Sequence, residues 1–142
     1  MTGASATPRG VLDTNTLLLL SRVSDASALP EEPLITAITL AELSVGPLVA
    51  TSETVREARQ AHVQQAEADF DPLPFDAAAA RAFGRVGASL RRAGRKPAAR
   101  AYDAMIAAIA IAADLPLHTC NPDDFAGIEG LTLVVVPHPD HR

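Results

Sequence analysis

The most constraining feature of this sequence is an uninterrupted apolar run from Met105 to Ala113 within a segment of helical character. A helix that is apolar on every side must be covered on most of its surface, so the run predicts a helix inside a layered domain. No segment of the chain reaches the ~18 consecutive apolar residues of a membrane span. The chain is therefore expected to form a folded domain outside the membrane.

Short apolar segments typical of buried strands alternate with helical segments along the chain. The expected strands are 10–12, 34–36, 115–119 and 131–136, and the expected helices are 14–24, 39–45, 52–69, 77–92 and 98–113. Gly46 and Pro47 are expected to end the second of these helices. This alternation predicts an α/β fold whose mainly parallel central sheet is covered by helices on both faces.

A length of 142 residues suits one domain, which we expect to span residues 10–136. Residues 1–9 are expected to form a flexible N-terminal tail and residues 137–142 a C-terminal tail. The single Cys120 excludes a disulfide framework and a cysteine-rich zinc site. Because residues 1–8 lack the basic and apolar segments of a secretion signal, we expect a cytoplasmic protein.

Four carboxylates stand in unusually apolar surroundings, at or near the ends of the predicted elements. They are Asp13, Glu42, Asp103 and Asp124. A buried carboxylate is normally paired, protonated or bound to a metal ion, because its isolated charge is costly. Since functional groups gather beyond the carboxyl ends of parallel strands, the four acids can converge at one edge of the sheet. Clustered carboxylates favour a hard cation such as Mg²⁺ or Mn²⁺.

Each acid also has a structural interpretation. Asp13 and Asp124 could cap the helical segments beside them, and Asp103 could be a first-turn acid favoured by the helix dipole. Glu42 could pair with an arginine on a half-exposed helix face. On this interpretation the chain is a non-catalytic α/β interaction module with a basic face that binds a partner.

Four segments, in their order and spacing from about residue 10 to 136, resemble the PIN-domain ribonucleases, and among them the VapC toxins of toxin–antitoxin pairs. The segments are Val11-Leu12-Asp13-Thr14-Asn15, Thr39-Leu40-Ala41-Glu42-Leu43, Tyr102-Asp103-Ala104-Met105-Ile106-Ala107-Ala108 and Thr119-Cys120-Asn121-Pro122-Asp123-Asp124-Phe125. The resemblance implies a three-layer α/β/α PIN-like fold and a metal-dependent endoribonuclease that cleaves RNA through metal-activated water. It further implies a VapB-type antitoxin partner and a homodimer.

The resemblance also implies roles for individual residues. Asp13 and Asp103 would be the main Mg²⁺ ligands (Mn²⁺ being the alternative ion), and Glu42 and Asp124 would complete the site. Asn15, Thr119 and Asn121 would be supporting polar groups. Asn121 departs from the acid that many family members have at its position, so Asp123 and His118 remain alternative participants.

A basic tract interrupts this otherwise acidic chain, whose formal net charge is −5. Seven of the twelve Lys and Arg residues lie between Arg81 and Arg100, and no acid occurs between Asp76 and Asp103. Arg81, Arg85 and Arg92 fall on one side of the helix expected there. We therefore interpret these three arginines as contacts for RNA phosphates, the alternative being a solvated helix face.

Overall fold

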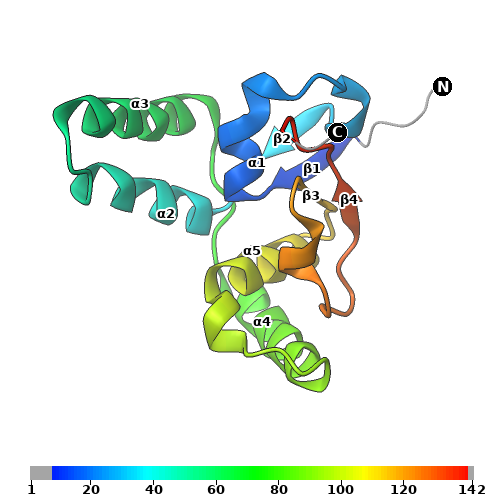
Figure 1. Cartoon of the computed structure of the whole chain (residues 1–142). Helices are drawn as coiled ribbons and strands as arrows, with labels where there is room; N and C mark the ends of the chain where they lie inside the picture. Colours follow the sequence, from blue (N-terminus) through cyan, green and yellow to red (C-terminus); the bar gives the residue numbers. More distant parts are fainter. Residues whose placement is uncertain (1–7, 141–142) are drawn as a thin grey trace.

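The computed structural model describes residues 8–140 and contains a four-stranded sheet at its centre (Figure 1). The strands are β1 (Arg9–Leu12), β2 (Glu32–Leu34), β3 (Leu117–Thr119) and β4 (Leu133–Val135). Their order is β2-β1-β3-β4, and every pairing is parallel. The predicted α/β fold with a parallel sheet is confirmed.

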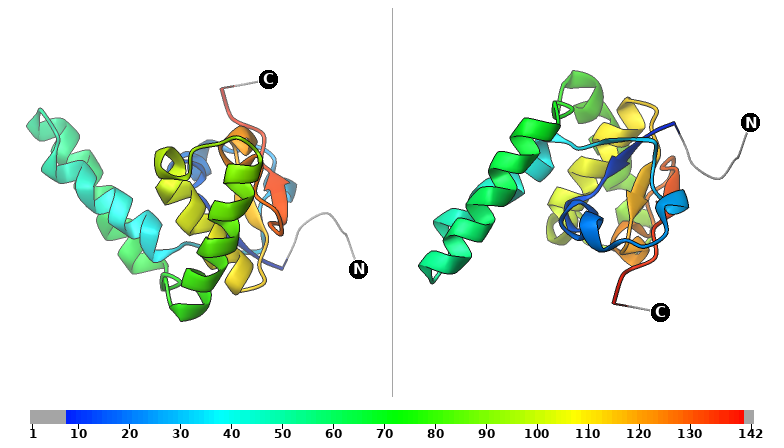
Figure 2. Two further views of the ribbon diagram at one scale, coloured as in Figure 1. Left: turned by 90° about the horizontal axis from the view of Figure 1, so that it is seen from below. Right: turned by 90° about the horizontal axis from the view of Figure 1, so that it is seen from above.

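Helices connect the strands and form the outer layers. The α-helices are α1 (Thr14–Leu19), α2 (Ala37–Leu48), α3 (Glu53–Asp69), α4 (Ala77–Arg92) and α5 (Ala101–Ala112). Four single 3₁₀ turns are η1 (Leu20–Arg22), η2 (Ala26–Ala28), η3 (Pro97–Arg100) and η4 (Pro122–Phe125). Helix α5 covers one face of the sheet and α4 packs on the outer side of α5. Helix α1 lies on the other face, and the α2–α3 hairpin extends away from the sheet (Figures 1 and 2).

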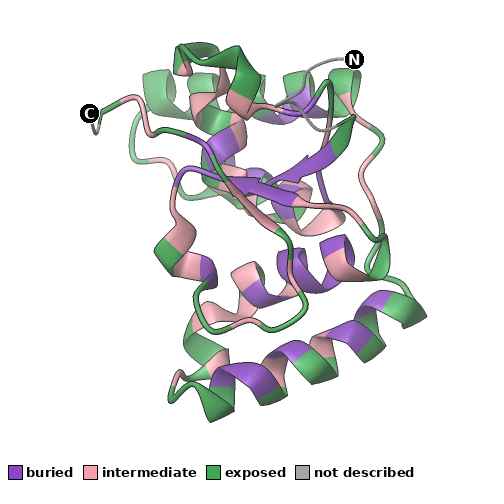
Figure 3. Ribbon diagram, turned by 90° about the vertical axis from the view of Figure 1, so that its right-hand side faces the viewer, coloured by how far each residue is buried: buried purple, intermediate pink, exposed green. Residues whose placement is uncertain are grey.

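The main core lies between the sheet and α5. Val11 and Leu117 pack there against Ile106, Ala107 and Ala110. The opposite side of α5 packs on α4, so that buried positions run along both helices (Figure 3). The apolar run thus lies inside the domain as predicted, up to Ala110. Its last turn is less well covered, because Ala112 and Ala113 are exposed.

The structure corrects the ends of several predicted elements. The helix predicted over 14–24 ends at Leu19 and is followed by the 3₁₀ turn η1. Strand β2 ends at Leu34 instead of beginning there, and it includes Pro33, which a strand at the edge of a sheet tolerates. Helix α2 does not stop at Gly46 and Pro47 but continues to Leu48. Pro47 is buried in its last turn, and Arg59 of α3 donates a hydrogen bond to the Gly46 carbonyl at 2.9 Å. This contact satisfies one of the last carbonyls of α2, which have no partner within the helix.

The predicted tails fall partly outside the described residues. Residues 1–7 of the predicted N-terminal tail and residues 141–142 of the C-terminal tail belong to this undescribed part. Within the described part, β1 already begins at Arg9. No helix in residues 8–140 is long and apolar enough to cross a membrane.

Candidate active site

Asp13 lies at the carboxyl end of β1 and is the N-cap of α1. Its Oδ1 accepts a hydrogen bond from the backbone N–H of Thr16 at 3.2 Å, and its Oδ2 accepts one from Thr119 Oγ1 at 3.0 Å. The residue is 3% exposed. Burial raises the pKa of Asp13 above its ordinary value, although the hydrogen bonds from Thr16 and Thr119 oppose the shift. Asp13 is therefore both a helix cap and a buried carboxylate held in a fixed orientation.

Glu42 lies in the middle of α2 and faces the start of α1. Its Oε1 accepts a hydrogen bond from Thr14 Oγ1 at 2.7 Å. Since that hydroxyl has a single proton, Thr39 Oγ1 must donate the further hydrogen bond that joins it to Thr14 at 2.9 Å. Burial raises the pKa of Glu42, and repulsion from Asp13 adds to this effect. The partner of Glu42 is thus a threonine and not the arginine of the structural interpretation.

Asp103 lies in the first turn of α5, and Asp124 lies in η4, which follows β3. Burial, as the largest cause, and repulsion from the other three acids together raise the pKa of Asp103 to about 6; these acids are Asp124, Asp13 and Glu42. Asp124 Oδ1 accepts a hydrogen bond from Arg100 Nη1 at 3.0 Å. This guanidinium opposes the upward shift of the Asp103 pKa.

The four predicted acids thus come from four elements and influence one another at the carboxyl edge of the sheet. Their oxygen donors and mutual repulsion match the ligand chemistry of a hard divalent cation. Within residues 8–140, no three acidic, histidine or cysteine side chains are close enough to form a ready metal-binding group. Protein donors instead engage Asp13, Glu42 and Asp124. A cation entering the cluster would compete with these donors.

Comparison with known proteins identifies the family. The family model of the PIN domain matches residues 11–131. The chain belongs to the PIN-domain family. It is similar to ribonuclease VapC5 of Mycobacterium tuberculosis (strain ATCC 25618 / H37Rv), with 38% identity over 135 residues that cover 93% of this chain and 97% of that protein.

Solved structures agree with the PIN-domain assignment. VapBC-5 of the VapBC toxin–antitoxin family, from Mycobacterium tuberculosis, contains a chain with 35% identity and a TM-score of 0.77, covering 91% of this chain and 98% of that one. DNA-bound VapBC from Salmonella typhimurium contains a chain with 27% identity and a TM-score of 0.67. The match covers 89% of this chain and 97% of that one. The predicted PIN-like three-layer fold is confirmed.

The supporting residues predicted for this PIN domain differ in their placement. Thr119 contacts Asp13 directly, and its hydroxyl also accepts a hydrogen bond from the backbone N–H of Asn121 at 2.9 Å. Asn15 and Asp123 are exposed, and none of the hydrogen bonds found in the described residues joins their side chains to the four acids. Their participation remains a prediction.

His118 precedes Thr119 on β3, so its side chain points to the other face of the sheet. The residue is 1% exposed, and its Nδ1 lies 3.2 Å from the Ala28 carbonyl oxygen. A Cβ at Gly10 would lie 2.4 Å from the His118 ring, which explains the glycine in β1. Burial lowers the pKa of His118. These contacts indicate a packing role for the histidine.

Three residues of the site were not among the predicted ones. Thr14 holds Glu42, Arg100 holds Asp124, and Thr16 accepts a hydrogen bond from the Cys120 backbone N–H at 2.9 Å. The sequence indicates only that Thr14 and Arg100 are close to predicted acids, since Thr14 directly follows Asp13 and Arg100 lies three residues before Asp103. Their partners are 28 and 24 residues away, which only the fold reveals.

The three predicted RNA-binding arginines are exposed on α4. Arg92 has an acidic partner, Glu129, with Arg92 Nη2 3.1 Å from Glu129 Oε1 and Arg92 Nε 3.4 Å from its Oε2. The sequence between Asp76 and Asp103 contains no acid, but the fold brings Glu129, from the loop after η4, to Arg92. No Arg–carboxylate pair found among the described residues includes Arg81 or Arg85.

Proposed function

We propose that this PIN domain is a metal-dependent endoribonuclease that hydrolyses RNA phosphodiester bonds and is the toxin of a VapBC-type toxin–antitoxin pair. The main supporting observation is the convergence of Asp13, Glu42, Asp103 and Asp124 at one sheet edge. The similarity to ribonuclease VapC5, which extends over 93% of the chain, supports the choice of RNA as substrate. Both an RNA substrate and an antitoxin are consistent with the cytoplasmic location that we expect.

Asp13 and Asp103 would hold Mg²⁺ or Mn²⁺, with Glu42 and Asp124 beside them. When bound, such an ion polarises a phosphate and lowers the pKa of a water molecule, which supplies the nucleophile. Thr119 and Thr14 keep the carboxylates of Asp13 and Glu42 oriented. The raised pKa values of Asp13, Glu42 and Asp103 express an electrostatic cost that a cation would offset.

The test is cleavage of a labelled RNA by the purified full chain. We expect cleavage with Mg²⁺, none in excess chelator, and recovery when Mg²⁺ or Mn²⁺ is restored. Asp13→Asn purified in the same way controls for a contaminating nuclease, and it should be inactive. Cleavage that persists in chelator, or that Asp13→Asn retains in full, would contradict the proposal. Tight RNA binding without cleavage under any ion would favour the interaction module.

The exposed arginines of α4 are proposed to contact RNA phosphates. Replacing Arg81, Arg85 and Arg92 by Gln should weaken binding of every RNA sequence alike. Since each contact to a single strand contributes ~0.7 to the slope of log affinity against log salt, three lost contacts should flatten that slope by roughly two units. A salt titration of RNA binding in chelator measures this directly.

The control for that experiment changes the same number of charges elsewhere. Arg9, Arg22 and Arg56 are exposed arginines outside the tract, and each is paired with an acid. Replacing these three by Gln should leave the salt slope nearly unchanged. Equal slopes for the two triple variants would show that the α4 arginines are not the RNA contact surface.

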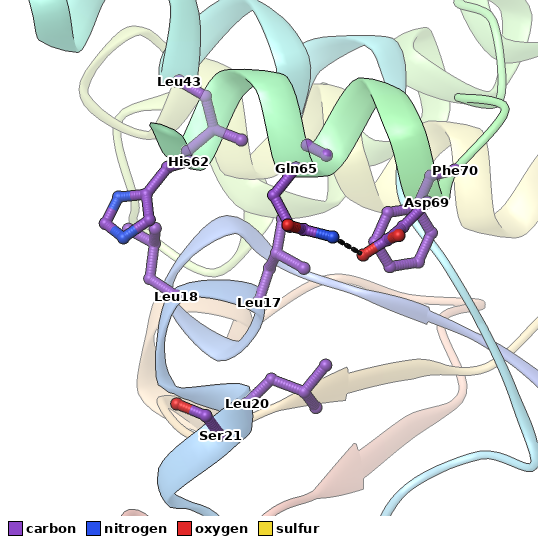
Figure 4. Close-up of a pocket in the computed structure, with 10 residues that line it drawn as sticks. Leu17, Leu18, Leu20, Ser21, Leu43, His62, Gln65, Asp69 and Phe70 are labelled. Atoms are coloured by element: carbon purple, nitrogen blue, oxygen red, sulfur yellow. Dashed lines mark hydrogen bonds between the residues drawn. The ribbon is translucent and has the colours of Figure 1, made fainter. Parts of the chain in front are cut away.

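The antitoxin partner is proposed to occupy an apolar pocket beside the acids. This pocket of about 290 Å³ lies between α1 and the α2–α3 hairpin and is lined by Leu17, Leu43 and Phe70 among others (Figure 4). A neighbouring cavity of about 210 Å³ shares Leu18, Leu43 and His62 with it and reaches Thr14 and Glu42. A partner with apolar side chains in the first cavity could place a Lys or Arg beside Glu42. Homodimerisation remains a further part of the proposal.

A further inference from the structure

Arg100 is a cation built into the acidic cluster. It is the last residue of η3 and the N-cap of α5, and its side chain is 33% exposed, against 35% for its partner Asp124. The exposed Arg92–Glu129 pair is less protected, with side chains 61% and 69% exposed. Because water screens a half-buried charge less than an exposed one, Arg100 acts more strongly on its surroundings than the other arginine.

Among the arginines paired with a carboxylate in residues 8–140, Arg100 is the one whose partner belongs to the acidic cluster. The other Arg–carboxylate pairs found in residues 8–140 join acids that lie outside the cluster: Glu32, Asp140, Glu53 and Glu129. Arg100 also lowers the pKa of Asp103, against the repulsion of the neighbouring carboxylates. One guanidinium at the N-terminus of α5 therefore acts on two of the four acids, Asp124 and Asp103.

We propose that Arg100 is a positioning residue that serves as the counter-ion of Asp124 and thereby limits the site to one tightly bound divalent ion. This inference rests on the proposed function. Four ionised carboxylates and Arg100 have a formal charge of −3. One bound divalent ion changes the net charge of the cluster to −1, whereas a second ion would make this net charge positive. Without Arg100, the four carboxylates and the first ion have a net charge of −2, which favours binding of a second divalent ion.

The experiment is a titration of the full chain with Mn²⁺. Binding is measured by calorimetry and by electron paramagnetic resonance of the bound ion. The wild type should bind one Mn²⁺ tightly. Arg100→Gln should bind the first ion roughly tenfold more tightly and take up a second ion, because a repelling charge is removed. Arg56→Gln is the matched control, since it breaks the exposed Arg56–Glu53 pair on α3, outside both the cluster and the proposed RNA contacts, and it should behave as the wild type.

Arg100→Lys keeps the charge and should keep the single ion. Thermal unfolding in chelator shows whether each variant is folded, and Arg100→Met, which keeps an apolar stem, replaces Arg100→Gln if the latter is unfolded. Two equally tight ions in the wild type would overturn the counter-ion role, as would an Arg100→Gln titration identical to that of Arg56→Gln. Either result leaves the nuclease proposal standing. A wild type that binds no Mn²⁺ would overturn both.

Discussion

Replacing Asp103 with asparagine is expected to abolish RNA cleavage and also to make the ion-free protein more stable. Burial is the main cause that raises the pKa of Asp103 from 3.8 to about 6. At neutral pH the ionised carboxylate therefore lowers the free energy of unfolding, and a neutral amide of similar shape removes this penalty. Because the side chain is half-exposed, we expect a gain of roughly 1–2 kcal/mol after solvent screening.

The same variant should lose about 100-fold or more in cleavage rate, because it removes a charged oxygen ligand from the proposed ion site. Thermal unfolding in chelator and cleavage of labelled RNA in Mg²⁺ measure the two effects. Asp114→Asn is the matched control: Asp114 lies just after α5, is exposed, and has a φ of 56° that asparagine tolerates. Full activity of Asp103→Asn would contradict the proposed role.

The candidate acids could be predicted from the sequence because their surroundings are locally unusual. Asp13 follows a buried strand, Asp103 precedes an apolar helix, and the parallel topology brings such positions to one edge. The residues that hold the acids could not be predicted in the same way. Thr14 and Arg100 act through partners that are distant in the sequence, and neither residue type is unusual on a surface helix.

The errors in the fold have a similar origin. Pro33 argues against a strand when only local preferences are considered, but β2 lies at the edge of the sheet, where the missing amide is tolerated. Gly46 and Pro47 likewise favour the end of a helix. Packing of Pro47 in the interior and the Arg59 contact outweigh that preference. In both cases tertiary context decides against local propensity.

Stabilisation by Mg²⁺ is expected to increase with pH. In the ion-free protein, burial and repulsion raise the pKa of Asp103 to about 6, and the pKa values of Asp13 and Glu42 are also raised. These carboxyls bind protons more readily in the folded chain than in the unfolded one. The contribution of Asp103 to stability is therefore fully present below about pH 4 and is lost as the pH rises through about 6, and Asp13 and Glu42 act in the same direction. His118 acts in the opposite sense, because burial lowers its pKa and it disfavours folding below about pH 6.5.

The Mg²⁺-induced shift separates these effects, since His118 faces away from the cluster and contributes equally with and without the ion. At neutral pH and an ion concentration about 100 times the Kd, Mg²⁺ should add about 2.7 kcal/mol to the free energy of unfolding. Below about pH 6 the ion must displace a proton from Asp103, so its affinity should fall by up to tenfold per pH unit. Thermal unfolding at about pH 5 and about pH 8 should thus show a much smaller shift at the lower pH. In Asp103→Asn the Mg²⁺-induced shift should be small at both pH values. An equal shift of the wild type at the two pH values would mean that the ion does not bind at these carboxylates.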